Sequence, residues 1–344
     1  MATITFGDAI DRKAWDAEVL SLGGHLLQSA TWGDFKSRFG WTTVRVRTES
    51  PHGVALAQLL FKQKGPLSVG YVPRGPVVSS LDLTLLGEAV TAVDEASRSK
   101  RAIFTVLEPE QLSDWQKLPS VSPGPAAVQP LRTVKIALDD DDAIFSRMHQ
   151  KTRYNTRLAL RKGIKVLPES ADGDGFTAFY NLMQETAARN QFAIHSAEYY
   201  RGVLEAFGND AALMVARTES GIPVAALVVV CFGEEAVYLY GASTSEPEYR
   251  VMHPGFALQF ETMRWARDRG SHVYDLWGIP EADPVSTTVT EGDRVAPTRG
   301  DDWRGLYEFK TRFGGEIISY PKPLQRDYVP VLPGLARRIF RPGG

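Results

Sequence analysis

One lysine near the end of the chain stands among aromatic residues, in the segment Trp303-Arg-Gly-Leu-Tyr-Glu-Phe-Lys310-Thr-Arg-Phe-Gly-Gly315. If the ammonium group of Lys310 lies in a cleft between Phe309 and Phe313, it can stabilise the oxyanion formed when a nucleophile attacks a carbonyl. The same residues also suit an ordinary helix end, closed by glycine, where Lys310 and Arg312 favour the C-terminus. The spacing of these residues, taken alone, favours an ordinary helix end over a catalytic lysine.

A second group of charges follows the acidic run 139–142. Residues 143–168 contain no acidic residue, and we expect a helix there with the aspartates at its N-terminus. Arg153, Arg157, Arg161 and Lys165 recur every four residues and form one stripe on such a helix. This stripe suits phosphate groups, either of a nucleotide-linked substrate or of tRNA. A solvated helix face is about as common, but the lack of counter-charge favours phosphate binding.

Two turns rich in glycine and proline could present backbone groups to a ligand. Tyr71-Val-Pro-Arg-Gly-Pro76 follows a predicted strand, and Met252-His-Pro-Gly-Phe-Ala257 opens a predicted helix. In acyltransferases of the GNAT fold, this helix start carries Q/R-x-x-G-x-G/A, whose amides hold the CoA pyrophosphate. Met252 replaces the first residue, so the loop is a degraded CoA site. An ordinary helix start with an early proline explains it equally well.

Several other chemistries lack the residues they need. Gly241-Ala-Ser-Thr-Ser lacks the last glycine of a nucleophile elbow, and neither G-x-x-x-x-G-K-[ST] nor G-x-G-x-x-G occurs. The six histidines show no pair at metal-binding spacing. Cys231, the single cysteine, excludes a disulfide framework. With no signal peptide and no membrane-spanning run, we expect a cytoplasmic protein.

Hydrophobic periodicity predicts the same order of elements in both halves of the chain. The first half is expected to contain a helix at 27–39, strands at 43–47, 54–61 and 67–72, a helix at 83–98 and a strand at 102–107. The second half is expected to contain helices at 174–189 and 197–207, strands at 212–217, 224–232 and 236–240, a helix at 255–269 and a strand at 272–277. This α/β (α+β) order suggests a duplicated unit and is that of the GNAT fold.

The length of 344 residues suits two domains. Turn residues at 120–125, followed by the acidic run, place the boundary after residue 142. The polar segment 279–302 lacks periodicity, and a loop of that length is usually functional or disordered. It lies directly before the Lys310 segment.

Four segments together resemble the FemABX family of aminoacyl-tRNA-dependent peptidyltransferases. They are Leu27-Gln-Ser-Ala-Thr-Trp-Gly-Asp-Phe-Lys36, Met148-His-Gln-Lys-Thr-Arg-Tyr-Asn-Thr-Arg-Leu-Ala-Leu-Arg-Lys-Gly163, Tyr238-Leu-Tyr-Gly-Ala-Ser243 with its continuation through His253-Pro-Gly-Phe-Ala-Leu-Gln259 to Tyr274-Asp-Leu-Trp-Gly278, and Gly305-Leu-Tyr-Glu-Phe-Lys-Thr-Arg-Phe-Gly-Gly315. The resemblance implies two GNAT-like domains flanking a cleft, one of residues 1–142 with about 321–344 and one of 143–320. No 50-residue heptad segment occurs, so we do not expect the long helical arm of some members.

The reaction implied by this resemblance transfers an amino acid from aminoacyl-tRNA to an amine of the stem peptide of a peptidoglycan precursor. Because the ester is already activated, aminolysis requires no Ser or Cys nucleophile and needs orientation and oxyanion stabilisation. The resemblance assigns Lys310, with Phe309, to the tRNA end and the ester carbonyl. Aminoacyl-tRNA is a co-substrate, and no cofactor is implied.

The resemblance also assigns residues to the acceptor, a UDP-linked or lipid-linked precursor. Lys36 is assigned to its phosphates, and Arg189 is assigned to the precursor on a looser match. Tyr71 and Gly75 are assigned, also loosely, to a channel for the peptide. No residue is assigned as general base, and the identity of the amino acid is left open.

Two other functions stay open. One is a Fem-like N-acyltransferase that uses acyl-CoA or another acceptor outside cell-wall synthesis, and Met252 disfavours it. The other is a non-catalytic RNA- or nucleotide-binding protein, which Lys36 and Lys310 together disfavour. Residues 331–341 form a basic amphipathic pattern that suits peripheral membrane contact, although packing on the first domain is the commoner fate. We expect a monomer.

Overall fold

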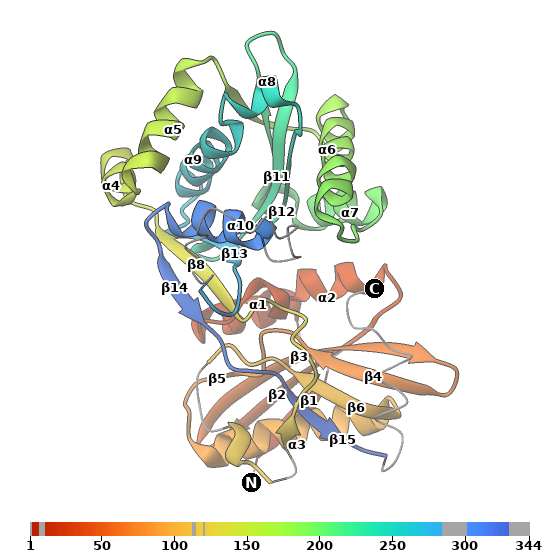
Figure 1. Cartoon of the computed structure of the whole chain (residues 1–344). Helices are drawn as coiled ribbons and strands as arrows, with labels where there is room; N and C mark the ends of the chain where they lie inside the picture. The colour runs from red at the N-terminus through yellow and green to blue at the C-terminus, as the bar shows by residue number, and fades with distance from the viewer. Residues whose placement is uncertain (1, 7–10, 112–114, 120, 284–300, 330–344) are drawn as a thin grey trace, which may run out of the picture. The chain divides into compact units, whose positions relative to one another are not determined.

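The computed structural model describes residues 2–6, 11–111, 115–119, 121–283 and 301–329. The chain forms two units, unit 1 from Met1–Leu131 with Tyr320–Gly344 and unit 2 from Arg132–Ser319 (Figure 1). This division comes earlier than the predicted boundary after residue 142. The reason is that β8 (Arg132–Ala137) already pairs within the sheet of unit 2, and the acidic run caps a helix of that unit.

Unit 1 is built on a mixed sheet with strand order β1-β2-β3-β4-β6-β15-β7, in which β5 also pairs with β3. Its strands are β1 (Thr3–Phe6), β2 (Thr42–Ser50), β3 (Gly53–Lys64), β4 (Leu67–Val72), β5 (Val77–Val78), β6 (Ala102–Leu107), β7 (Ser122–Pro123) and β15 (Leu324–Asp327). Its helices are α1 (Arg12–Ser21), α2 (Ala30–Ser37) and α3 (Leu83–Ser99), with short 3₁₀ turns at Leu26–Gln28 and Trp115–Lys117. Helices α1 and α2 cover one face of the sheet and α3 covers the other (Figure 1).

The sequence of α3 explains both its start and its packing. Asp82 caps the helix by accepting hydrogen bonds from the amides of Thr84 and Leu85, a contribution of about 1 kcal/mol. Apolar residues then recur at helical spacing and are buried against the sheet: Leu85, Leu86, Ala89, Val90, Val93 and Ala96. The helix thus fixes β6 parallel to β4.

Unit 2 is built on a second mixed sheet with strand order β14-β8-β13-β12-β11-β10-β9. Its strands after β8 are β9 (Lys165–Glu169), β10 (Ala211–Arg217), β11 (Pro223–Phe232), β12 (Glu235–Ser243), β13 (Val273–Gly278) and β14 (Glu316–Ser319). Its helices are α4 (Asp141–Arg147), α5 (Gln150–Arg161), α6 (Asp174–Asn190), α7 (Ala197–Phe207), α8 (Pro247–Arg250), α9 (Pro254–Arg267) and α10 (Asp301–Thr311), with a 3₁₀ turn at Gly208–Asp210.

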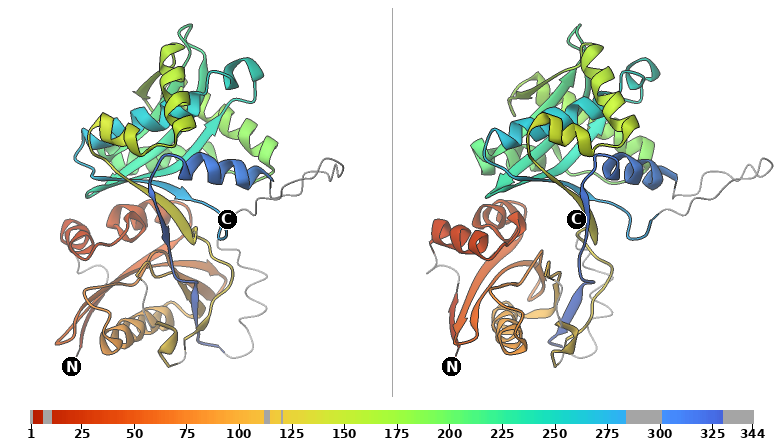
Figure 2. Two further views of the ribbon diagram at one scale, coloured as in Figure 1. Left: turned by 60° about the vertical axis from the view of Figure 1, so that its left-hand side comes forward. Right: turned by 90° about the vertical axis from the view of Figure 1, so that its left-hand side faces the viewer.

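The two faces of the unit 2 sheet carry different helices. Helix α9 packs on β10 and β11 and carries α5 on its outer side. Helices α6 and α7 cover the opposite face (Figure 1), and the same two layers are visible from other directions in Figure 2. The core between them is rich in aliphatic residues from the central strand β11, including Val224, Leu227 and Val229.

Both units repeat one arrangement, which confirms the predicted fold class. In each, three antiparallel strands (β2-β3-β4 and β10-β11-β12) lead to a helix (α3 or α9) and then to a strand parallel to the third. That last pairing is β4 with β6 in unit 1 and β12 with β13 in unit 2. Sequence periodicity predicted this order because each element is long enough to show its own hydrophobic pattern.

The single helix expected over residues 143–168 was wrong. Met148 has extended backbone angles, and His149 caps a new helix by accepting from the amide of Lys151. Helix α5 then ends before Gly163, which adopts a positive φ of 78° suited to glycine at a helix end. Lys165 lies on strand β9, so it does not belong to the stripe of Arg153, Arg157 and Arg161.

Among the described residues, no helix is long and apolar enough to cross a membrane. The longest helices there, α3 and α6, have 17 residues each, so this part of the chain has no long helical arm. Most of the polar segment 279–302, at 284–300, and the amphipathic segment 331–341 lie outside the described residues.

Candidate functional site

Lys310 lies in unit 2, where α10 meets the strands β12 and β13. Its Nζ donates a hydrogen bond to the carbonyl oxygen of Gly278, the last residue of β13, at 2.8 Å. The same Nζ lies 5.3 Å from the ring centroid of Tyr238 on β12. Strands β12 and β13 pair directly only through Glu235–Val237 of β12. Lys310 contacts the two strands further along, at Tyr238 and Gly278, where they no longer pair. Only 5% of Lys310 is exposed, so α10 delivers a cation into the interior.

Burial changes the ionisation of this lysine. Desolvation lowers the pKa of Lys310 to about 7, against a smaller opposing effect of the negative charge of Asp275. Asp275 is buried within β13 and accepts hydrogen bonds from the hydroxyl of Thr133 and from the amide of Trp277. A lysine with this pKa changes its charge near neutral pH, which is typical of functional sites.

The aromatic surroundings of Lys310 differ from the prediction. Phe309 and Phe313 pack together at 5.2 Å between ring centroids, and both contact Phe256 of α9. The two rings turn toward α9, and Lys310, which follows Phe309 directly in the chain, turns toward β12. The ammonium group therefore lies over Tyr238 and not between the two phenylalanines. Burial also raises the pKa of Tyr238, to about 12.

A pocket of about 440 Å³ opens beside this lysine in unit 2. Its walls include Arg189 from α6, Tyr238 from β12, Gly255 and Phe256 from α9, and Phe309 from α10. Two predicted site residues, Arg189 and Phe309, therefore meet in one pocket, and the Nζ atom of Lys310 lies over the ring of Tyr238, which lines the same pocket. The Nη1 atom of Arg189 donates to the Ser245 hydroxyl at 2.7 Å and to the Ser243 carbonyl oxygen at 3.3 Å.

The N-terminus of α9 forms another side of the same pocket. His253 precedes the helix with a positive φ of 58°, and Pro254 occupies the first turn. Met252 packs against the hydrophobic core, so its side chain offers no contact to a phosphate group. Arg250 lines the pocket together with His253. This loop was predicted from the sequence as a possible ligand site. The sequence did not indicate that Arg250, His253 and Tyr238 line one pocket.

Lys36 lies in unit 1 on α2, beside two tryptophans and a second lysine. Its Nζ is 5.3 Å from the ring centroid of Trp41 and 6.0 Å from that of Trp32. The Nζ of Lys62, on β3, is also 5.3 Å from the Trp41 ring. Desolvation, followed by repulsion from Lys62, lowers the pKa of Lys36 to about 8. Two cations on one indole ring favour an anionic ligand. Neither Lys62 nor Trp41 was predicted from the sequence as a site residue.

The structure places Tyr71 and Gly75 inside unit 1. Tyr71 is 6% exposed, and its hydroxyl donates to Oε2 of Glu108 at 2.5 Å. Burial and the Glu108 carboxylate raise the pKa of Tyr71 well above its ordinary value. A Cβ atom on Gly75 would lie 2.8 Å from the Gln28 side chain, so glycine permits a close approach. Neither residue lines a pocket described in this section.

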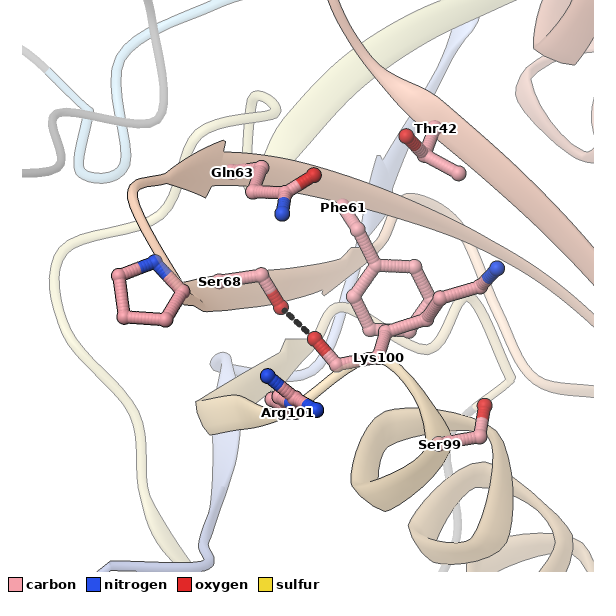
Figure 3. Close-up of a pocket in the computed structure, with 8 residues that line it drawn as sticks. Thr42, Phe61, Gln63, Ser68, Ser99, Lys100 and Arg101 are labelled. Carbon is pink, nitrogen blue, oxygen red and sulfur yellow. Dashed lines mark hydrogen bonds between the residues drawn. The ribbon is translucent and has the colours of Figure 1, made fainter.

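Unit 1 also contains a smaller hollow of about 210 Å³, shown in Figure 3. It lies between the β3–β4 hairpin and the end of α3, with Lys100 and Arg101 at its rim. The Ser68 hydroxyl donates to the Lys100 carbonyl oxygen at 2.8 Å. None of the residues predicted from the sequence as site residues lines this hollow.

The predicted basic stripe divides into residues with different surroundings. Arg153 Nη1 donates to the carbonyl oxygen of Phe145 at 3.1 Å and reaches those of Ser146 and Met148 at 3.4 and 3.5 Å. It therefore caps the end of α4. Arg157 lies over the ring of Phe145 at 4.9 Å but is exposed.

We expect Arg153→Met to lower the free energy of unfolding by about 1 to 2 kcal/mol, because the carbonyl groups ending α4 lose a charged donor. Arg161→Met, on the exposed face of the same helix, is expected to change it by less than about 0.5 kcal/mol. Urea unfolding of both variants beside the wild type measures the difference. Equal stability of the two variants would show that the Arg153 contacts contribute nothing.

Comparison with known proteins assigns most of the chain to one family. The sequence model of the FemAB family matches residues 13–122, 124–220 and 217–322. A lipid II:glycine glycyltransferase of Staphylococcus epidermidis is 25% identical, with 89% of this chain and 88% of that protein covered. One of Staphylococcus aureus is 23% identical with the same coverage. Both relatives are aminoacyltransferases by name, the class of enzyme predicted from the sequence.

Solved structures agree with the family assignment at the level of the fold. The crystal structure of FemX matches with a TM-score of 0.79 at 20% identity, covering 98% of this chain and 99% of that chain. A tandem GNAT protein from the clavulanic acid biosynthesis pathway matches with a TM-score of 0.56 at 12% identity, covering 96% and 99%. The two GNAT-like units are therefore confirmed, and the chain belongs to the FemAB family.

Proposed function

We propose that this protein transfers an amino acid from aminoacyl-tRNA to an amine of the stem peptide of a peptidoglycan precursor. The observation that supports this most is the buried ammonium group of Lys310, held by the Gly278 carbonyl beside a pocket. Membership of the FemAB family and relatives named lipid II:glycine glycyltransferases support the same reaction and favour a lipid-linked acceptor. Because charged tRNA is found in the cytoplasm, we propose that the reaction takes place there.

The chemistry is aminolysis of an ester. The acceptor amine attacks the carbonyl carbon of the aminoacyl ester, and the carbonyl oxygen becomes an oxyanion. The Lys310 ammonium donates a hydrogen bond to this oxyanion in a site sheltered from water, where its charge acts strongly. The intermediate collapses with formation of the amide and loss of the terminal ribose oxygen of the tRNA, which takes up the proton released by the amine. Phe309 packs beside the tRNA end.

Recognition of the precursor rests on other residues. We assign its phosphates to Lys36, joined by Lys62, because an anion relieves the repulsion between two ammonium groups that share the Trp41 ring. Arg189 is assigned to the precursor as well, since its guanidinium group suits a carboxylate of the peptide. Tyr71 forms buried hydrogen bonds, and Gly75 packs closely against Gln28. We therefore propose that these two residues support the neighbouring turn and do not contact the peptide directly.

The test of this function is transfer itself. Purified protein is mixed with tRNA charged with glycine, alanine or serine and with a lipid-linked or UDP-linked precursor, and the product is weighed by mass spectrometry. We expect the precursor to gain the mass of one amino acid residue with at least one charged tRNA. Uncharged tRNA is the control. Failure with every charged tRNA and both precursors would reject the proposal.

One observation favours an acyl-CoA-dependent enzyme as the second candidate. The pocket is lined by the start of α9, where the GNAT fold binds the CoA pyrophosphate. Against it, Met252 packs in the core and leaves one phosphate contact missing. Calorimetry with acetyl-CoA separates the two candidates, because we expect no binding at micromolar concentrations. A micromolar dissociation constant would favour the second candidate.

A further inference from the structure

The exposed face of α5 combines one aromatic side chain with four cations. Lys151, Arg157, Arg161 and Lys162 are exposed, and Tyr154 between them is 57% exposed. These five residues are here called the α5 surface. The buried face of the helix instead holds Thr152, Asn155, Thr156 and Ala159. Lys151 and Lys162 are about 16 Å apart along the helix axis, so the α5 surface is long enough to contact several nucleotides.

The charges of the α5 surface differ from those on neighbouring helices. Elsewhere in unit 2 arginines are paired with acids, as in Arg147 with Asp139 at 2.6 Å and Arg267 with Asp141 at 2.8 Å. Arg312 likewise pairs with Glu308 at 2.9 Å. Helix α5 contains no acidic residue. Within the described ranges, no acidic side chain forms an ion pair with the α5 surface, so its positive charge is available to a ligand.

The α5 surface lies beside the loop before α9, and that loop forms part of the wall of the 440 Å³ pocket. Lys162 Nζ donates to the Val251 carbonyl oxygen at 2.9 Å, just before α9. The pKa of His253 is lowered by desolvation and then by the positive charges of Lys162 and Lys151, which places both lysines near that ring. The ring centroids of His253 and Phe256 are 5.9 Å apart, and those of Phe256 and Phe309 are 5.0 Å apart. These contacts connect the α5 surface to the helix that holds Lys310.

We infer that the α5 surface binds the acceptor arm of the charged tRNA, with its cations on phosphates and Tyr154 against a base or ribose. The 3′ end then passes His253 and Arg250 into the pocket. This inference rests on the proposed function and adds the path that the donor follows. The cations suit the phosphates of the double-stranded acceptor stem, and an exposed aromatic ring beside them suits a base of the single-stranded 3′ end.

A membrane is the other anionic partner that such a surface could bind. A membrane-binding helix needs a broad apolar face for the acyl region. On α5 the leucines Leu158 and Leu160 are only partly exposed, and Leu160 packs against the core. The α5 surface therefore offers one tyrosine and no aliphatic face to a bilayer, and RNA suits it better.

The test compares two variants of the α5 surface with a control of equal charge change. Lys151→Glu with Arg161→Glu is expected to weaken binding of charged tRNA at least tenfold and to lower the slope of log affinity against log salt by about 1.4 to 1.8, since roughly 0.7–0.9 is lost for each of the two phosphate contacts. Tyr154→Ala is expected to weaken binding about fivefold or more with an unchanged slope. Lys13→Glu with Lys100→Glu, two exposed lysines of unit 1, is expected to change neither quantity.

Single-turnover transfer with two donors separates failure of this inference from failure of the function. With full-length tRNA the charge-reversed α5 variant should be slowed, and with an aminoacylated dinucleotide that lacks the acceptor stem the slowing should be much smaller. If the charge-reversed variant binds tRNA as tightly as the wild type does, and the wild type transfers normally, the inference about the α5 surface is overturned but the proposed function is not. Loss of binding to vesicles of anionic phospholipid with unchanged tRNA affinity would also overturn it, in favour of a membrane surface. A wild-type protein that transfers from neither donor would reject the function.

Discussion

Lys310→Met is expected to slow single-turnover transfer from charged tRNA by about 10²–10³-fold, the usual effect of losing one oxyanion donor. Methionine keeps the length and apolar character of the side chain and removes the ammonium group. The contact with the Gly278 carbonyl and with the Tyr238 ring shows that the charge is held in one place. A donor fixed in advance costs no reorganisation during the reaction.

The same substitution is expected to leave the protein folded and more stable in acid. Burial lowers the pKa of Lys310 from 10.5 to about 7, so the folded state binds this proton less tightly than the unfolded state. The resulting loss of stability is complete below about pH 7 and fades as the pH rises toward 10.5. This loss is at most roughly 4 to 5 kcal/mol at 1.36 kcal/mol per pKa unit. The gain of the methionine variant is smaller by about 1 to 3 kcal/mol, because the Gly278 carbonyl loses its donor.

Chemical unfolding at pH 6 and at pH 10 checks this expectation beside the kinetic assay. The methionine variant should gain stability over the wild type at pH 6 and lose that advantage at pH 10. A folded variant that keeps most of its rate would make Lys310 an ordinary helix-end lysine. Lys310→Arg is the matched control for charge, and we expect it to restore the rate only partly because the guanidinium group is planar and larger.

Replacing both lysines beside Trp41 is expected to weaken precursor binding about 100-fold. Each ammonium group that contacts a phosphate contributes roughly 1.5 kcal/mol or more, or about tenfold in affinity. We therefore expect about tenfold for Lys36→Met or Lys62→Met and the larger loss for the double variant. Transfer at saturating precursor should change little, because we propose that these residues bind the precursor and take no part in the chemical step.

Lys64→Met is the control for this series, since Lys64 lies on the same strand as Lys62 but is exposed at its end. Titration of a fluorescent precursor with each variant gives the affinities. Removing Lys62 should also raise the pKa of Lys36, because one repelling charge is lost. An unchanged affinity in the double variant would assign the phosphates to other residues.

The elements of both units were predictable wherever one hydrophobic period runs through a whole element. Strand β4 and helix α3 follow their predicted ranges closely, because apolar residues mark one face and Asp82 marks the helix start. The segment 143–168 misled the prediction, because charges at helical spacing continue past a helix end. Gly163 was the available signal, since glycine at positive φ often ends a helix.

The site was predictable only in part, since its partners come from distant parts of the chain. Lys310 and Lys36 stand in recognisable segments, but the ring that each contacts depends on tertiary packing. Tyr238 comes from a strand 72 residues before Lys310 in the sequence, and Lys62 comes from a different element from Lys36. Arg153 shows the converse, because a charge that suits phosphate in the sequence is used to cap α4.

The most direct test of the central claim, that the Lys310 ammonium stabilises the oxyanion, is the ratio of wild-type to Lys310→Arg single-turnover rates between pH 5.5 and 9. Ionisation of the attacking amine cancels in this ratio, and Tyr238, with a pKa of about 12, does not titrate in the range. Arginine stays charged throughout. Because the Lys310 pKa is about 7, the ratio should be constant in acid and fall about tenfold per pH unit above 7. A ratio that rises through pH 7 would contradict the account, since the neutral amine would then be the active form.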